Sequence, residues 1–149
     1  MLKTYIILVA AGCAVCGLAF GAASWSGQPY ALIVGNHITG PAQAPTGLLE
    51  MTLDHDGPCT IGVSVDHAGN EVLNCSGETL VTGYKLTGAA LQNGDADWVS
   101  SSTFLTRNYD VQGNGPSDPI TLWVRAAGAS SRANNAGTYS ASVILTVSW

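Results

Sequence analysis

The alternation of apolar and polar residues is clearest at the end of the chain, in residues 139–149. Every second residue there is apolar, and the residues between them are mostly Ser or Thr. A period of two places alternate side chains on opposite faces of a strand, and β-branched residues favour that pleated conformation. We therefore predict a long strand with one face on a hydrophobic core and an edge that needs a partner. Its apolar positions are Tyr139, Ala141, Val143, Leu145, Val147 and Trp149.

Shorter segments repeat this alternation, whereas no segment keeps a helical period. Residues 24–29 look like a flexible entry, and Gly, Pro, Asn and Asp mark the loops between strands. We predict an all-β chain that forms a single immunoglobulin-like antiparallel β-sandwich of seven or eight strands after a signal peptide. The predicted strands cover residues 30–39, 49–53, 59–65, 71–75, 80–87, 120–126 and 139–149, with shorter pieces in 98–106 and 109–111. The predicted loops cover residues 40–47, 92–97, 112–119 and 127–137.

The N-terminal part, residues 1–23, differs in composition from the rest of the chain. Lys3 supplies a positive start, residues 5–20 are apolar and uncharged, and small residues follow. This pattern is typical of a secretory signal peptide, and we expect cleavage after Gly21 or Ala23. A single membrane-anchoring helix is the first alternative, because the apolar run is almost long enough to span a bilayer. Lipidation at Cys13 is the second, because residues 10–13 loosely resemble a bacterial lipobox.

The expected organisation has three parts. Residues 1–23 are the signal peptide, residues 24–47 hold a possible donor or first strand, and residues 48–149 form the sandwich domain. Removing the leader leaves four basic residues against ten acidic ones, a net charge of −6. Such a surface repels phosphate backbones and anionic lipids, so we expect no nucleic-acid partner and no membrane contact after leader removal.

Four cysteines are present, and two of them, Cys13 and Cys16, would be discarded with the leader. The remaining pair, Cys59 and Cys75, predicts a disulfide in an exported chain. A hairpin turning at residues 66–70 would place these two cysteines opposite each other, with Ile61 opposite Leu73.

Candidate metal ligands occur in two places. His55 and His67 each follow an Asp, and they could bind a metal such as zinc if their two loops met. Asp95 and Asp97 offer the oxygens that calcium prefers, but their segment lacks the ligand number of a recognised calcium loop. Polar residues are common at loop ends, so we expect no metal and no cofactor.

Motifs for catalysis are missing from the sequence. No Ser can be placed with a His and an acid as a triad, and there is no nucleophile elbow or phosphate-binding glycine loop. We therefore expect that the protein is not an enzyme. Trp25 and Trp123 are candidates for exposed positions, and Trp123 beside Arg125 would either form a binding patch or cover a sheet face.

The ending AGTYSASVILTVSW, residues 136–149, resembles the C-termini of chaperone–usher pilus subunits, especially the archaic type related to spore coat protein U. Its Gly-Thr-Tyr entry also resembles the tyrosine corner of immunoglobulin-like sandwiches, in which the Tyr hydroxyl bonds back to the backbone. In the pilus family the sandwich lacks its last strand. A periplasmic chaperone supplies that strand first, and the N-terminal extension of the next subunit supplies it afterwards.

This resemblance implies roles for two sets of residues. The assembly edge would comprise Gly137, Tyr139, Val143, Leu145, Val147 and Trp149. The donor strand would comprise Tyr30, Leu32, Val34 and Ile38.

Two functions follow as hypotheses. The first is an exported structural protein of the cell surface, a pilus-like or coat subunit that passes through the periplasm, with self-assembly and a periplasmic chaperone as possible partnerships. The alternative is a self-complete secreted immunoglobulin-like adhesion module, which recognises a ligand or carbohydrate through loops 92–97, 112–119 and 127–136. The two hypotheses differ in whether residues 30–39 leave their own sandwich or pair inside it.

Overall fold

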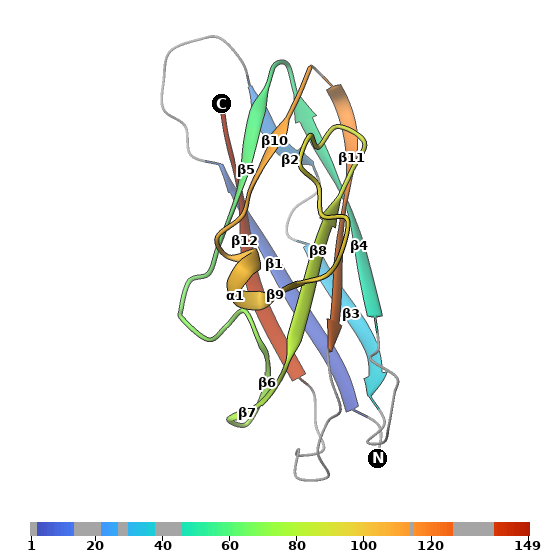
Figure 1. Ribbon diagram of the computed structural model, residues 1–149, viewed down its shortest axis with the longest axis vertical. Coiled ribbons are helices and arrows are strands. Elements are labelled where there is room, and N and C mark those ends of the chain that lie inside the picture. The colour runs from blue at the N-terminus through green and yellow to red at the C-terminus, as the bar shows by residue number, and fades with distance from the viewer. Residues whose placement is uncertain (1–2, 14–21, 27–29, 38–45, 114, 127–138) are drawn as a thin grey trace.

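Two β-sheets packed face to face form the molecule, which confirms the predicted all-β sandwich (Figure 1). The computed structural model describes residues 3–13, 22–26, 30–37, 46–113, 115–126 and 139–149, with 3–13 and 30–37 as backbone. Twelve strands lie in these segments rather than seven or eight, because several short strands of two to four residues accompany the long ones.

The first sheet, here called sheet A, is built around the C-terminal strand. Along its main path β12 lies between β5 and β1, and each pair is antiparallel except β1 with β12, which is parallel. Two further strands, β6 and β7, join at the beginning of β12. In order, the path is β10 (Asn108–Val111), β5 (Cys59–Ser64), β12 (Tyr139–Ser148), β1 (Lys3–Cys13) and β3 (Tyr30–His37), with β6 (Leu73–Cys75) and β7 (Glu78–Leu80) beside it.

The second sheet, sheet B, is antiparallel throughout. Its central strand is β11, which pairs with β4 on one side and β8 on the other. In order, the sheet is β2 (Ala23–Ser26), β4 (Thr46–His55), β11 (Gly115–Ala126), β8 (Thr82–Thr87) and β9 (Val99–Ser100).

The core lies between the sheets and follows the alternation in the sequence. On β12 the odd-numbered side chains are buried and the even-numbered ones are exposed or half-buried. On β11 the residues predicted to face inward, Ile120, Leu122, Val124 and Ala126, are all buried. Full burial of each large apolar side chain contributes roughly 1.5–3 kcal/mol to folding, so the alternation itself selects which face of each strand turns inward.

The short helix α1 (Ser101–Phe104) was not predicted. Ser100 caps it, because its hydroxyl accepts a hydrogen bond from the backbone N–H of Thr103 at 3.2 Å. The turn carries Phe104 into the core, where its ring stacks on Tyr84 with 4.7 Å between centroids. Among the described residues no helix has the length and apolar character needed to cross a membrane.

Residues 24–29 were expected to be a flexible entry, and this expectation is wrong for the first of them. Residues 23–26 form β2, in which Ala23 pairs with His55 and Trp25 with Leu53. Trp25 is only 7% exposed, so the expected surface position of this side chain is also wrong. Its indole N–H donates to the carbonyl oxygen of Leu145 in the opposite sheet at 3.1 Å, which joins the two layers.

The predicted hairpin between residues 59–65 and 71–75, and the disulfide it implied, are also wrong. Thr60 pairs with Ser148 and Asn74 pairs with Ser140, so the strands of Cys59 and Cys75 meet opposite ends of β12. At about 3.3 Å per residue these ends lie roughly 26 Å apart, whereas a disulfide needs Cα atoms within about 7 Å. Both thiols are free. The local hairpin does not form because its two halves pair with the same edge of β12 at positions too far apart along that strand to pair with each other.

Candidate functional site

The outer edge of β12 is covered by a strand from the N-terminal part of the chain. On its inner side β12 pairs with β5 and β6, and on its outer side it pairs with β1 (Figure 1, red and blue strands). The β1 pairing is parallel and runs without a break from Tyr5 opposite Tyr139 to Cys13 opposite Val147. Because β1 lies within the leader-like residues 1–23, the strand that closes this edge is the one that processing would remove.

The predicted assembly-edge residues fall into three groups. Tyr139, Val143, Leu145 and Val147 are buried on β12 and face the core. Trp149 follows the end of the strand and is 43% exposed. Gly137 lies outside the described residues. The strand therefore offers its backbone at the outer edge, while its large side chains already belong to the core.

The predicted donor strand lies one position further along the same sheet. Tyr30, Leu32 and Val34 belong to β3, which pairs antiparallel with β1, and Ile38 lies outside the described residues. Since β1 is parallel to β12, β3 runs antiparallel to β12. One strand, β1, separates the proposed donor from the proposed edge.

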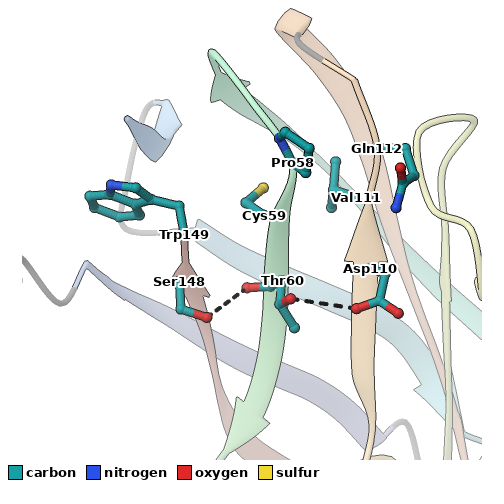
Figure 2. Close-up of a pocket in the computed structure, with 8 residues that line it drawn as sticks. All are labelled: Pro58, Cys59, Thr60, Asp110, Val111, Gln112, Ser148 and Trp149. Atoms are coloured by element: carbon teal, nitrogen blue, oxygen red, sulfur yellow. Dashed lines mark hydrogen bonds between the residues drawn. The ribbon is translucent and has the colours of Figure 1, made fainter. Parts of the chain in front are cut away.

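A surface hollow of about 310 Å³ lies where β12 ends, beside the beginning of β5 and the end of β10 (Figure 2). Two hydrogen bonds join residues that line the hollow. The Ser148 hydroxyl donates to the Thr60 carbonyl oxygen at 3.5 Å, and the Thr60 hydroxyl donates to Asp110 Oδ1 at 3.4 Å. Its lining comprises Pro58, Cys59, Thr60, Asp110, Val111, Gln112, Ser148 and Trp149. These long, weak hydrogen bonds tie the three strands together, and the hollow offers little enclosed apolar surface to a small ligand.

A buried ion pair joins β4 to β11 near the same end of the sandwich. The His55 side chain is fully buried, and its Nε2 lies 2.8 Å from Asp118 Oδ2. Its Nδ1 lies 2.9 Å from the Gly57 carbonyl oxygen. A carbonyl and a carboxylate accept hydrogen bonds, so both contacts are satisfied when each ring nitrogen carries a proton, which favours the protonated imidazole.

The electrostatics agree with this assignment. Burial lowers the pKa of His55, but the hydrogen bonds to Asp118 and Gly57 and the charges of Asp118 and Asp56 outweigh it, so the pKa is raised.

Residues 112–119 were expected to form a loop, and this is wrong from Gly115 onward, where β11 begins with a bulge between Pro116 and Asp118. The bulge turns the Asp118 carboxylate toward His55, as bulges often re-aim a side chain.

Gly115 makes room for that carboxylate. A Cβ atom at this position would overlap the Asp118 side chain, so any larger residue would push Asp118 away from His55. Sequence inspection missed this arrangement because His55 and Asp118 are 63 positions apart and become neighbours only when β4 pairs with β11. The prolines of residues 112–119 were the available signal, since Pro inside a strand marks an edge or a bulge.

We expect stability to fall with rising pH because of His55. Its folded-state pKa is above the unfolded value of about 6.5, so the stabilisation is complete below that pH and is lost as pH rises through the folded pKa. Urea unfolding between pH 5.5 and 8.5 measures this slope. His55→Gln should flatten the slope and cost about 2 kcal/mol at pH 5.5, as the loss of a charged hydrogen bond does. His67→Gln, at an exposed histidine, is the control and should keep the slope.

The His55 pair does not activate the nearby thiol. Both imidazole nitrogens are already engaged, so neither can take a proton from Cys59. Burial, and to a smaller extent the charge of Asp118, raises the pKa of Cys59, which keeps it as a thiol near neutral pH. This cluster therefore has the features of a structural ion pair rather than those of a cysteine nucleophile with its base.

The proposed metal ligands are not brought together. His55 precedes β5 and His67 follows it, so roughly 20 Å of strand separates the two loops. Asp95 is buried and accepts hydrogen bonds from the Tyr109 hydroxyl at 2.5 Å and the Leu86 backbone N–H at 2.9 Å. Among the described residues no cluster of three or more His, Cys, Asp or Glu side chains could hold a metal ion.

The outer face of sheet B carries a small aromatic patch. The Arg125 guanidinium lies 4.5 Å from the centroid of the Trp98 ring, a cation–π contact. Trp123 is half-buried on the same strand as Arg125 and donates its indole N–H to the Thr87 hydroxyl at 3.0 Å. These side chains cover the sheet surface and hold one another in place.

The described residues thus contain the β1–β12 edge, the His55–Asp118 pair and the aromatic patch on sheet B, each built by strand pairing. Neither the buried pair nor the patch brings together the set of groups that a catalytic centre requires. Comparisons with known protein families and with curated proteins find no match for this chain.

Proposed function

We propose that this protein is an exported structural subunit that assembles at the cell surface by β-strand complementation along its C-terminal strand. The observation that carries the proposal is the identity of the strand on the outer edge of β12, which is β1. Removal of the leader would take β1 away and leave the backbone N–H and C=O groups along Tyr139–Val147 without that partner. An open hydrophobic edge of this length must be covered, because unpaired strand edges recruit other strands.

The position of β3 supports the same proposal. In the described part of sheet A, β3 pairs with β1 alone, so loss of the leader would release both β3 and the edge of β12. A β3 strand that kept its present direction would run antiparallel to β12, and antiparallel pairs are slightly more stable per residue than parallel ones. Exchange of β1 for β3 would therefore improve the pairing. The resemblance of residues 136–149 to pilus subunits supports a neighbouring subunit as the source of that strand, and a periplasmic chaperone as an earlier partner.

The second candidate is a self-complete adhesion module, and a specific observation favours it as well. The β3 strand already lies in the same sheet, one strand from β12, so it could close the gap within its own chain. The outward patch of Trp98, Trp123 and Arg125 would then be a surface for a carbohydrate or protein ligand. The expected ligand loops support this function less, because residues 115–119 belong to β11 and Asp95 is buried in the core.

The size of the processed protein separates the two functions. We expect a purified chain of residues 22–149 to form polymers that resist detergent without heating, because each β3 completes the sheet of a neighbour. A version lacking residues 30–39 should lose these polymers. A synthetic peptide of residues 30–39 should bind that version at one peptide per chain. Light scattering and unheated gel electrophoresis measure both results.

Charged substitutions in β3 give a matched control. The double variant Leu32→Asp with Val34→Asp changes the donor parity, whereas Ala31→Asp with Ile33→Asp changes the other parity of the same strand. The first should abolish the polymers and the second should largely retain them. A monomer of residues 22–149 that unfolds when residues 30–39 are deleted would instead establish the closed adhesion module.

A further inference from the structure

Ala22, which immediately precedes β2, contacts the carboxylate of Asp56, the residue that follows β4. The backbone N–H of Ala22 donates to Asp56 Oδ1, and the backbone N–H of Asp56 donates to the Ala22 carbonyl oxygen at 3.1 Å. The next residue, Ala23, pairs with His55 and is only 3% exposed. The chain is therefore held at Ala22 and Ala23 by pairing, hydrogen bonding and burial before it reaches the anchor at Trp25.

This contact lies in a second hollow, of about 280 Å³. Its lining comprises Ala22, Ser24, Asp54, His55, Asp56 and Pro116. Ala22 itself is exposed. Two carboxylates face the hollow, and one of them already accepts a hydrogen bond from the Ala22 nitrogen.

We propose that the exported protein begins at Ala22, and that Asp56 binds the α-ammonium group that cleavage creates there. The inference rests on the leader removal assumed in the proposed function. Of the two cleavage positions that the sequence allows, the earlier one keeps the Ala22–Asp56 contacts and the Ala23–His55 pair. Cleavage after Ala23 would remove both sets of contacts and would require hydrolysis next to a buried residue.

Hydrolysis by a leader peptidase changes the charge at this point of the fold. Water adds across the peptide bond, which leaves a carboxylate on the departing leader and an ammonium group on Ala22. The neutral backbone N–H of Ala22, which donates to Asp56 in the uncleaved chain, becomes an ammonium cation with three N–H donors at the same position. A charged donor on a carboxylate forms a shorter and stronger hydrogen bond than a neutral one.

The surrounding charges favour a cation at Ala22. Asp54 and Asp56 lie on β4 and the turn that follows it, and both line the hollow. His55 faces Asp118 of β11 and the Gly57 carbonyl, which occupy its two ring nitrogens. Asp56 is therefore the carboxylate placed for the new terminus, while Asp54 Oδ1 accepts a hydrogen bond from the Ser117 hydroxyl at 3.3 Å.

The first test is the N-terminus of the full chain after export from a bacterial host, read by intact mass and N-terminal sequencing. We expect a product that starts at Ala22. A product that starts at Ser24 would overturn the inference but would leave assembly by strand complementation intact. A product that retains residues 1–21 would overturn the inference together with leader removal.

The second test measures the amine itself in the processed protein of residues 22–149. A pH titration of the Ala22 amino group by nuclear magnetic resonance should give a pKa above the ordinary range of about 7.7–8.0. Asp56→Asn should return the pKa to that range and lower the folding equilibrium constant at pH 7 roughly two- to five-fold, as expected for an exposed ion pair. Asp54→Asn is the matched control and should change both quantities less.

The sign of the pH dependence follows from the raised amine pKa. The stabilisation is present below the pKa of the unfolded amine and is lost as pH rises through the folded value. An ordinary amine pKa, or equal effects of Asp56→Asn and Asp54→Asn, would overturn the role of Asp56. Failure of the processed protein to polymerise would count against the proposed function without affecting this result.

Discussion

Replacement of Asp95 by alanine is expected to lower the free energy of unfolding by about 3–4 kcal/mol, measured by urea denaturation. The Asp95 carboxylate is buried and accepts hydrogen bonds from the Tyr109 hydroxyl and the Leu86 backbone N–H. Without it, two buried donors lose their acceptor, and each unsatisfied group costs about 1–3 kcal/mol. The loss is a large fraction of the 5–15 kcal/mol that stabilises a typical domain.

Two variants locate the effect of Asp95. Asp97→Ala, two residues further on and exposed, should change stability by less than about 0.5 kcal/mol. Tyr109→Phe should cost about 1–2 kcal/mol, because Asp95 keeps the Leu86 N–H and its contact at 3.5 Å with Arg107. Burial, followed by the hydrogen bond to Asp95 and its charge, raises the pKa of Tyr109, so its hydroxyl remains a donor across the physiological range.

The role of residues 92–97, either structural or calcium-binding, can be tested with the same variant. If Asp95 holds the loop to the core, calcium should leave the unfolding midpoint of the unmodified protein unchanged. An Asp95→Ala variant as stable as the unmodified protein, together with stabilisation of the latter by calcium, would make the segment a cation-binding loop instead. The buried position of Asp95 favours the first outcome, because a calcium site needs six to eight oxygen ligands around the ion.

Replacement of Trp25 by alanine is expected to cost about 3–5 kcal/mol. The indole is almost fully buried between the sheets, and its removal leaves a large cavity. The variant also loses the hydrogen bond from the indole N–H to the Leu145 carbonyl oxygen, which connects β2 to β12 across the core. Thermal and urea unfolding of residues 22–149 measure the change.

Phenylalanine at the same position separates packing from hydrogen bonding. Trp25→Phe keeps an aromatic ring and should cost less than half as much as alanine. Trp149→Ala serves as the exposed control and should stay within about 0.5 kcal/mol. If Trp25→Ala and Trp149→Ala have equal effects, β2 does not belong to the folded core of the processed protein.

The hydrogen bond and burial of Trp25 would restrict the proposed strand exchange. Because Trp25 fixes β2 to its own sandwich, a donated strand can leave only after Ser26. Three residues separate Ser26 from Tyr30, and four Cα steps span at most roughly 14 Å. A neighbouring subunit that accepts β3 must therefore bring its β12 edge close to the N-terminus of the donor.

The local alternation of residues was sufficient to identify the long strands and their inward faces. On β12 and β11 the buried positions follow the period of two, because a strand with one apolar face has one favourable orientation against a core. The all-β class followed from the same signal. Short strands such as β2, and the single helical turn at residues 101–104, were missed because segments of two to four residues carry too little periodicity.

Strand partners were decided by the tertiary structure. The sequence suggested that residues 59–65 fold back on 71–75, but both segments pair with one edge of β12 at distant positions, which keeps Cys59 and Cys75 apart. A long alternating strand buries more surface than a local hairpin, and nothing in a local pattern shows which distant segment will pair with it. The same limit hid the His55–Asp118 pair and the Ala22–Asp56 contact, whose members are far apart in sequence.

The sequence by itself thus determined the class of fold, the inward face of each long strand and the unusual composition of residues 1–23. Only the tertiary structure decided that β1 covers the outer edge of β12 and that Ala22 contacts Asp56. The physical reason is that the alternation of apolar and polar side chains, which is local in sequence, determines which face of a strand is buried. Any strand can form backbone hydrogen bonds, so the identity of its partner depends on all the other strands of the folded chain.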